Sequence, residues 1–215
     1  MAEAAPDPGT IVGERLPRRW FARDSLVVAP ELLNKVLVCG DRAGRIVEVE
    51  AYRGGDDPAS HAYRGETPRV RTMFGPAGHL YVYFTYGMHW CANVVCGQEG
   101  EGTAVLLRAL APSAGLEAMR QARGAAARRD PDLCSGPAKL TQALGIGPDH
   151  DGADLVAGRQ VVVLDDGTPP PTAPVQSTRV GLSVGVEPLW RWFVPDDPNV
   201  SRGRPSGPQV PIEHR

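Results

Sequence analysis

A glutamate and a tyrosine two positions apart are the first residues in this sequence that could do chemistry together. Glu50 and Tyr52 close a stretch, residues 45–52, in which apolar and polar side chains alternate as they do in a half-buried strand. Residues two apart on a strand share a face, so the carboxylate and the ring should lie together. A carboxylate in that position can activate water beside a stacked ring. Taken alone the pair is weak evidence, because most glutamates at strand ends are simply solvated.

The tyrosines of the chain are concentrated in one region. All five lie between positions 52 and 86, and residues 80–90 hold five of the thirteen aromatic side chains. Rings gathered beside a hairpin-like Tyr86-Gly87 step suit stacking on flat ligands, above all on nucleic-acid bases. For Tyr81 and Tyr83, which alternate on one face, a place in the core is an equally ordinary explanation.

Other side chains could complete a site around Glu50. The candidates are His61 in a loop, Tyr83 and Tyr86 in the aromatic run, Asn93, and Arg108. Arg108 follows three apolar strand residues, and an arginine in that setting more often snorkels to the surface. Single residues therefore do not decide between a site and ordinary structure.

Length and composition bound the possibilities. A chain of 215 residues suits one domain with irregular ends. No apolar run approaches the roughly 20 residues of a membrane span, and the first ten residues lack the regions of a signal peptide, so we expect a cytoplasmic protein. The four cysteines are scattered without metal-ligand spacing, which predicts buried reduced thiols, no metal and no other cofactor.

The distribution of charge along the chain says more about possible partners than the net charge does. The net charge of −2 is poor for a DNA-binding protein, but residues 61–145 carry nine Arg or Lys against six Asp or Glu. Such a local excess can steer a polyanion. Only two residues, Lys35 and Lys139, are lysines, and neither lies in the candidate pocket segments, so an enzyme with this site would lack the amine that Schiff-base chemistry needs.

The elements that must position these residues can be predicted from periodicity and turn signals. Residues 54–74, rich in Gly, Pro and Arg, predict a long ordered loop. Helices are expected from Asp24 into the following Leu-rich stretch, over 116–127 with Ser113 as the cap, and from Ser135-Gly136-Pro137 to Gly145. Strands are expected at 35–39, 45–52, 80–85, 90–95, 103–109, 179–186 and 190–194. Together they indicate an α+β domain: a curved antiparallel sheet flanked by helices, with a protruding hairpin.

Several segments, taken together, resemble the alkyladenine (3-methyladenine) DNA glycosylase family. The resemblance covers roughly residues 20–200 and is densest over 46–145. The matching segments are Glu50-Ala51-Tyr52, Ala59-Ser60-His61, residues 69–74, Leu80-Tyr81-Val82-Tyr83, Tyr86-Gly87-Met88-His89, Asn93-Val94-Val95, residues 106–110 and Ser135-Gly136-Pro137-Ala138-Lys139-Leu140.

The resemblance implies a role for each matched position. Glu50 would deprotonate the water that attacks C1′ of a flipped nucleotide, and Arg108 would help to hold that water and the backbone. Tyr52, His61 and Tyr83, with Ala59, would wall the base pocket, and Asn93 would clash with the amino group of normal guanine. Tyr86 would fill the gap in the DNA, with Met88 beside it. The DNA backbone would be contacted by Arg69, Arg71, Gly136 and Lys139.

The function implied is that of a monofunctional DNA glycosylase in base excision repair. It would flip damaged purines of the 3-methyladenine, 7-methylguanine, hypoxanthine and ethenoadenine class out of double-stranded DNA, bind through the minor groove as a monomer, and leave an abasic site. The expected organisation is a disordered tail over 1–17, the glycosylase domain over 18–200, and a flexible tail over 201–215. Two alternatives stay open: a non-catalytic module that binds damaged DNA, and a nucleoside hydrolase.

Overall fold

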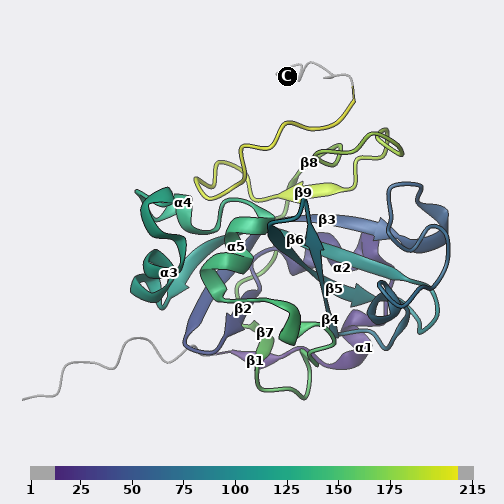
Figure 1. Ribbon diagram of the computed structural model, residues 1–215, viewed down its shortest axis with the longest axis horizontal. Coiled ribbons are helices and arrows are strands. Elements are labelled where there is room, and N and C mark those ends of the chain that lie inside the picture. Colours follow the sequence, from purple (N-terminus) through teal and green to yellow (C-terminus); the bar gives the residue numbers. More distant parts are fainter. Residues whose placement is uncertain (1–12, 208–215) are drawn as a thin grey trace, which may run out of the picture.

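The computed structural model describes residues 13–207, which form an antiparallel sheet with helices on both faces (Figure 1). The strands of the described chain are β1 (Glu14–Arg15), β2 (Val36–Cys39), β3 (Arg42–Arg53), β4 (Leu80–Thr85), β5 (His89–Cys96), β6 (Thr103–Ala114), β7 (Val161–Asp165), β8 (Val175–Ser177) and β9 (Arg191–Phe193). Their order is β1-β7-β2-β3-β6-β5-β4, with β9 paired to both β3 and β8. The α+β class expected from the sequence is confirmed.

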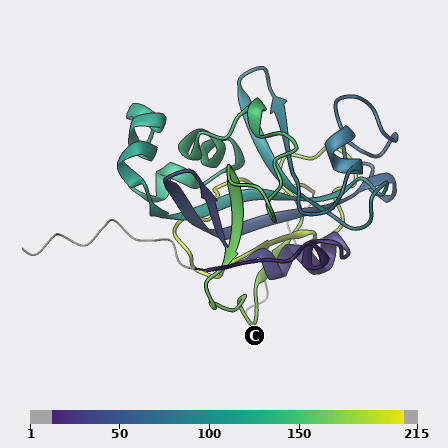
Figure 2. The ribbon, with the colours of Figure 1, turned by 90° about the horizontal axis from the view of Figure 1, so that it is seen from below.

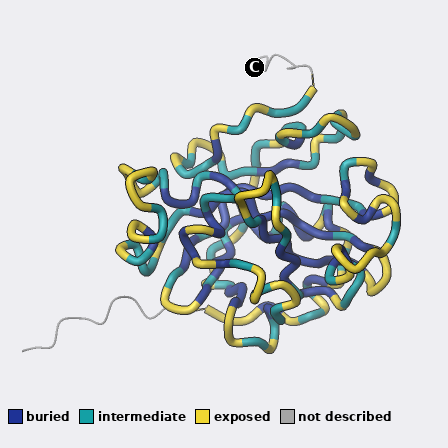
Figure 3. The backbone as a smooth tube through the Cα atoms, viewed as in Figure 1, coloured by how far each residue is buried: buried dark blue, intermediate teal, exposed yellow. Residues whose placement is uncertain are grey.

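Strand β3 is the centre of the sheet because it has partners along both edges. It pairs with β6 on one side and with β2, then β9, on the other. The middle of the sheet is buried, as the dark tube in Figure 3 shows. Between β3 and β6 the register shifts: Glu48 pairs with Ala109 and Val49 with Leu107, which leaves Arg108 as the extra residue of a β-bulge. Bulges re-aim side chains next to functional sites, and this one directs Arg108 toward the two glutamates of β3.

Helices cover the two faces of the sheet. In Figure 2, α1 and α2 lie on one side, and α3 and α5 lie on the other. Their bounds are α1 (Arg18–Phe21), α2 (Ser25–Leu32), α3 (Leu116–Arg123), α4 (Pro131–Cys134) and α5 (Pro137–Leu144). Helix α2 begins where the side chain of Asp24 accepts the Leu26 N–H at 2.8 Å. Helix α5 begins at Pro137 and ends at Gly145, whose φ of 72° suits glycine. Both helices were predicted.

Two irregular features project from the sheet on the side of α5. One is the β4–β5 hairpin, in register from Leu80↔Val94 to Thr85↔His89. The other is the predicted long loop 54–74, which contains the 3₁₀ turns η1 (Gly54–Asp56) and η2 (Arg71–Phe74). Figure 2 shows hairpin and loop extending in the same direction. Further 3₁₀ turns are η3 (Gly124–Ala126) and η4 (Pro148–His150).

Some predicted elements were wrong. Ser113 lies inside β6, which runs on to Ala114, and helix α3 begins instead after Gly115, whose φ of 69° makes the turn. That helix ends at Arg123 because Gly124 (φ 56°) follows it. Residues 179–186 form a loop, in which Val180 makes an isolated bridge to Pro205. They do not form a strand because the N–H groups of Val180 and Leu182 donate to the side chains of Glu50 and Ser206.

The predicted domain boundaries also differ from the structure. Glu14 and Arg15, placed in the N-terminal tail, pair with β7, and Ser201, placed in the C-terminal tail, is buried against Glu48. The described chain therefore extends past residue 200, and its last residue is 207. Of the two predicted tails, residues 1–12 and 208–215 lie outside the described residues.

All four cysteines, which are Cys39, Cys91, Cys96 and Cys134, are free and buried, as the sequence predicted. Burial raises the pKa of each thiol, that of Cys134 to about 12. These thiols are therefore protonated packing groups at neutral pH. Within residues 13–207, no helix has the length and apolar character to cross a bilayer.

Candidate active site

Glu50 lies in the middle of the buried sheet, enclosed by three hydrogen-bonding groups. Its Oε1 accepts the Val180 N–H at 2.7 Å and lies 3.2 Å from Nη1 of Arg108, and its Oε2 accepts the Tyr52 hydroxyl at 3.0 Å. The predicted shared face of Glu50 and Tyr52 is confirmed. The expectation of a strand-end position was wrong, because β3 continues to Arg53 and Glu50 has no exposed surface. The carboxylate does not line the cavity itself, but two of its partners, Tyr52 and Val180, do.

A second glutamate, Glu48, extends this site into a buried chain of charges. Arg108 Nε donates to Glu48 Oε1 at 2.8 Å, and Arg191 Nε donates to the same oxygen at 2.7 Å. The N–H and hydroxyl of Ser201 donate to Glu48 at 2.7 and 2.9 Å. Arg108 thus bridges Glu48 and Glu50, and the snorkelling alternative is excluded for this arginine because it is 5% exposed.

Electrostatics keep Glu48 and Arg108 of this network ionised. Burial favours a higher pKa for Glu48, but Arg108 and Arg191, together with the Ser201 N–H, outweigh burial and hold that pKa below its ordinary value. For Arg108, burial works against the charge, and the carboxylates of Glu50 and Glu48 outweigh it and raise the arginine pKa. Buried charges persist only when paired and hydrogen-bonded, and these are.

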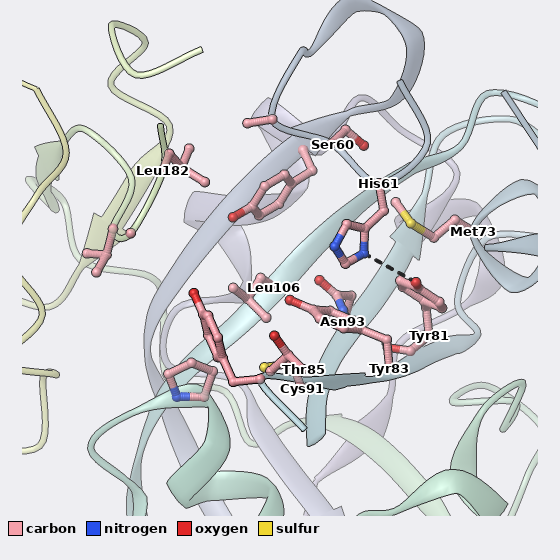
Figure 4. Close-up of a pocket in the computed structure, with 16 residues that line it drawn as sticks. Ser60, His61, Met73, Tyr81, Tyr83, Thr85, Cys91, Asn93, Leu106 and Leu182 are labelled. Atoms are coloured by element: carbon pink, nitrogen blue, oxygen red, sulfur yellow. Dashed lines mark hydrogen bonds between the residues drawn. The ribbon is translucent and has the colours of Figure 1, made fainter. Parts of the chain in front are cut away.

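Above the carboxylates a cavity of about 260 Å³ opens between β3, β4, β5, the loop after β3 and the segment after β8 (Figure 4). The structure brings Tyr52, Ala59, His61, Tyr83, Asn93 and Tyr86, all candidates from the sequence, into its wall. The other lining residues are Ser60, Met73, Tyr81, Thr85, Cys91, Leu106, Pro137, Val180, Gly181 and Leu182.

Aromatic rings form one side of the cavity. The rings of Tyr81 and Tyr83 are stacked with centroids 5.5 Å apart, and His61 meets Tyr83 edge-on at 4.5 Å. Nδ1 of His61 lies 3.4 Å from the Tyr81 hydroxyl, the contact drawn dashed in Figure 4. Burial raises the pKa of Tyr81 to about 12 and that of Tyr83 further, while burial and then Arg69 lower the pKa of His61. The wall is therefore uncharged at neutral pH, as suits a flat aromatic ligand.

Tyr81 is a cavity residue that was not among the site residues predicted from the sequence. It is 1% exposed and so is indeed packed, but it also lines the cavity. The alternation of β4 places it on the same face as Tyr83. That two-residue period was the signal that could have identified it.

Asn93 lies at the floor of the cavity. It is 5% exposed, and its Nδ2 donates to the Tyr81 carbonyl at 3.2 Å. This hydrogen bond orients the amide across the hairpin, where Asn93 pairs with Tyr81 in register. A fixed polar group on an otherwise apolar floor is the kind of feature that gives a pocket specificity.

The hairpin tip carries exposed apolar side chains beside the cavity mouth. Tyr86 (φ 51°) and Gly87 (φ 67°) occupy the centre of a turn closed by Met88 N–H donating to the Thr85 carbonyl at 3.2 Å. Two positive φ values are typical of a type I′ turn. Tyr86 is 83% exposed and Met88 is 68% exposed. An apolar tip that remains in solvent indicates a binding surface.

The other predicted DNA contacts surround this mouth or lie in the loop. Arg69 donates to the carbonyl of Phe84 on the hairpin at 3.4 Å, and exposed Arg71 lies 3.6 Å from Glu66. Gly136 precedes α5, whose Pro137 lines the cavity, and Nζ of Lys139 donates to Ser135 at 3.3 Å.

Neither lysine lines the cavity. Lys35 is buried at the far edge of the sheet, where its Nζ lies 2.8 Å from Asp165. Lys139 is held by Ser135 on α5 and is absent from the cavity wall. In the described chain, no lysine is placed to form an imine at this site.

Sequence reasoning missed the segment after β8. Its residues Val180, Gly181 and Leu182 line the cavity opposite the rings, and Val180 contacts Glu50. An irregular loop distant in sequence offers no periodicity from which such a role could be found.

Comparison with known proteins gives consistent matches. Residues 19–198 match the family model described as methylpurine-DNA glycosylase (MPG). A protein of Burkholderia cenocepacia (strain HI2424) is 58% identical over 204 residues, which make up 94% of this chain and 96% of that protein. Proteins of Rhodopseudomonas palustris (strain BisB5) and Methanoculleus marisnigri are each 50% identical over 194 residues, covering 88% and 87% of this chain and 90% and 98% of their own. All three carry the provisional name 3-methyladenine DNA glycosylase.

Proposed function

This chain belongs to the methylpurine-DNA glycosylase family, and we propose that it flips damaged purines out of duplex DNA and hydrolyses their N-glycosidic bond with water activated by Glu50. As a DNA glycosylase it is a hydrolase of N-glycosyl bonds that serves DNA repair. The observation that carries the mechanism is a buried carboxylate, paired with Arg108, directly behind a cavity of uncharged aromatic rings.

Base flipping is supported by the relation of the hairpin tip to the cavity. An enzyme acting at C1′ must take the nucleotide out of the stack and compensate for the lost stacking. Tyr86 is exposed at the tip and also borders the cavity, which supports the proposal that its ring fills the gap while the base enters the pocket. Side chains that wedge into duplexes in this way act from the minor groove. Acting at one flipped nucleotide requires only a monomer.

Glu50 has the contacts required of a general base. Val180 N–H and the Tyr52 hydroxyl donate hydrogen bonds to its two oxygens, and Arg108 forms an ion pair with it. In the proposed step a water oxygen bonds to C1′ while the bond from C1′ to the base nitrogen breaks and its electron pair leaves with the base. Glu50 accepts the water proton. Because the carboxylate is enclosed, this water reaches it from the cavity, between Tyr52 and Val180.

Selectivity follows from the leaving group and from the pocket. N-alkylated purines such as 3-methyladenine and 7-methylguanine are cationic, so they leave easily and are attracted to the faces of Tyr83 and its neighbours. Asn93, fixed by its bond to Tyr81, limits the room for the amino group of guanine. The proposed substrates also include hypoxanthine and ethenoadenine, which are flat and uncharged like the wall that would hold them.

The product should be an intact abasic site in a cytoplasmic base excision repair pathway. Imine formation needs an amine, and the cavity wall has none. The enzyme would therefore be monofunctional.

A direct test uses methylated duplex DNA, the same DNA as single strands, and free methylated nucleosides. We expect free 3-methyladenine and alkali-labile abasic sites to appear with the duplex. Binding of damaged duplex without base release would indicate a non-catalytic damage-binding protein. Equal release from free nucleosides would indicate a nucleoside hydrolase.

A further inference from the structure

A second buried ion pair, Arg179–Asp57, lies next to the catalytic carboxylate but outside the cavity wall. Nη1 and Nη2 of Arg179 donate to the two oxygens of Asp57 at 2.5 and 2.8 Å, and both side chains have no exposed surface. Two parallel bonds to one carboxylate fix the plane of a guanidinium as well as its position. Burying such a pair is costly, which makes it a poor choice for stability alone.

The pair connects three segments that carry the site. Arg179 Nη1 donates to the carbonyl of Ala51, the residue between Glu50 and Tyr52, at 3.0 Å. Its Nη2 donates to the Gly185 carbonyl at 3.0 Å, which closes the loop after β8. Asp57 in turn accepts the backbone N–H of Ala59 at 3.1 Å, at the start of the segment that carries His61. Strand β3 and both wall-forming loops are therefore held at one point.

The guanidinium of Arg179 also supports a ring of the cavity wall. Its central carbon lies 4.6 Å from the centroid of the Tyr52 ring and 5.0 Å from that of Trp190, so the cation stands against both rings. Contacts of this kind are favourable and are strengthened by burial. The hydroxyl of that same Tyr52 donates to Glu50.

The backbone that follows Arg179 supplies the second support of the carboxylate. Val180 N–H donates to Glu50 Oε1 at 2.7 Å, one residue after the anchored side chain. The carbonyl of Arg179 accepts the Ser206 N–H at 2.7 Å, and Ser206 Oγ accepts the Leu182 N–H at 2.8 Å. Anchoring Arg179 thus fixes two of the three groups that contact Glu50.

We propose that Arg179 and Asp57 are positioning residues for base release: they hold Tyr52 and Val180 on Glu50, and so align the carboxylate with the cavity. The proposal rests on the proposed function of Glu50. Neither residue lines the cavity and both side chains are fully buried, so their loss should slow release while leaving DNA binding intact. Misalignment by about 1 Å at a catalytic group can cost on the order of 100-fold in rate.

The test must separate positioning from folding, because removing one partner leaves a buried charge uncompensated. The double variant Asp57→Asn/Arg179→Met removes both charges, and the asparagine keeps an acceptor for Ala59 N–H. The control is Asp166→Asn/Arg45→Met, which removes a partly exposed Arg–Asp pair of the same two-bond geometry near the start of β3, outside the cavity wall. Arg179→Lys is the conservative variant, since lysine keeps the charge but not the planar two-bond contact.

Three quantities are measured for each protein: thermal melting, affinity for a duplex with a tetrahydrofuran abasic analogue, and single-turnover release of methylated purines. We expect the double variant to release base about 100-fold more slowly, with affinity within about threefold of wild type. The release rate of Arg179→Lys should lie between those of the double variant and wild type, and the release rate of the Asp166→Asn/Arg45→Met control should match that of wild type. If the double variant fails to fold, the release rate and affinity of Arg179→Lys test the proposal instead.

Wild-type release rates in the folded variants would overturn the proposal while leaving the function of Glu50 standing. Release and affinity that fall together would also overturn it, since that is the pattern of a general structural role. Absence of base release by the wild-type protein would instead refute the proposed function.

Discussion

The carboxylate network at the centre of the sheet and the tip of the β4–β5 hairpin differ in how far their proposed functional side chains are buried and held by neighbours. Glu48, Glu50 and Arg108 are buried and bonded to several partners each. Tyr86 is 83% exposed, on a turn in which it has a φ of 51°. The rigid network suits chemistry that requires fixed geometry, whereas the exposed tip suits insertion into a partner.

This comparison leads us to expect that mutations in the network affect stability and base release together, whereas mutations at the tip affect only the events on DNA. The variants that follow are ordered by the size of the expected effect.

Arg108→Met should have the largest effect because it leaves Glu48 and Glu50 without their shared cation. We expect unfolding free energy to fall by about 3–5 kcal/mol, the usual cost of breaking a buried pair, and base release to fall at least about 100-fold. Urea denaturation and single-turnover release measure the two effects. Arg120→Met, which breaks an exposed pair with Asp130, is the control and should leave unfolding free energy and base release close to those of wild type. A stable, active Arg108→Met protein would contradict the claim that base release requires the fixed geometry of this network.

Tyr86→Gly should separate the tip from the network. Glycine adopts the left-handed turn without strain, so stability should not fall, while loss of a stacking ring worth about 1–3 kcal/mol should slow base release about 10- to 100-fold. Melting temperature and release from methylated duplex test both statements. Tyr63→Ala removes another exposed tyrosine, outside the cavity wall, and serves as control. An equal loss of base-release rate in Tyr86→Gly and Tyr63→Ala would argue against a special role for the tip.

The pH dependence of stability should report on Glu48. Its pKa is lowered in the folded protein because its cations and the Ser201 N–H outweigh the opposing effect of burial. A carboxyl of this kind stabilises the fold above its unfolded pKa of about 4.3, and that contribution is lost as pH falls through the lower folded value. Wild-type unfolding free energy should therefore drop more steeply below about pH 5 than that of Glu48→Gln. Parallel curves would show that the network does not hold Glu48 ionised.

Lys139→Ala should have the smallest effect. We predicted that Lys139 contacts the DNA backbone, and loss of one phosphate contact should weaken DNA binding a few-fold and reduce the slope of log affinity against log salt by about 1. Abasic-site formation should continue without strand nicking in both proteins. Lys139→Arg, which keeps the charge, should restore the affinity. Nicking by wild type that disappears in Lys139→Ala would show that this amine takes part in catalysis.

The sequence predicted the parts of the site that follow local rules. Alternation in β3 placed Glu50 and Tyr52 on one face, the Tyr86-Gly87 step marked the hairpin, and Gly136-Pro137 marked the start of α5. These features depend on neighbours within a few residues, so periodicity and turn chemistry are sufficient to find them.

The features that were not predicted depend on contacts between distant segments. Ser201 reaches Glu48 across 153 positions, and Arg179 reaches Asp57 across 122. Both lie in irregular segments rich in Gly, Pro and Ser, where no period signals burial. The depth of Glu50 was missed for the same reason, because it is set by β9 and the loop after β8, which cover the far edge of β3.

Glu48 and Glu50 make the sharpest comparison in the molecule, because they share a face of β3 and both contact Arg108. Glu48 is surrounded by Arg108, Arg191 and Ser201, whereas two of the groups that contact Glu50 line the cavity. Of these two glutamates, Glu50 is therefore the one that we propose receives a proton from a water in the cavity.

The most direct test of the account is single-turnover release of methylated purines by Glu50→Gln and Glu48→Gln, measured beside their affinity for an abasic-analogue duplex. We predict that Glu50→Gln binds like wild type but releases base at least about 100-fold more slowly, while Glu48→Gln keeps measurable release once its lower stability is allowed for. Wild-type release by Glu50→Gln would contradict the account.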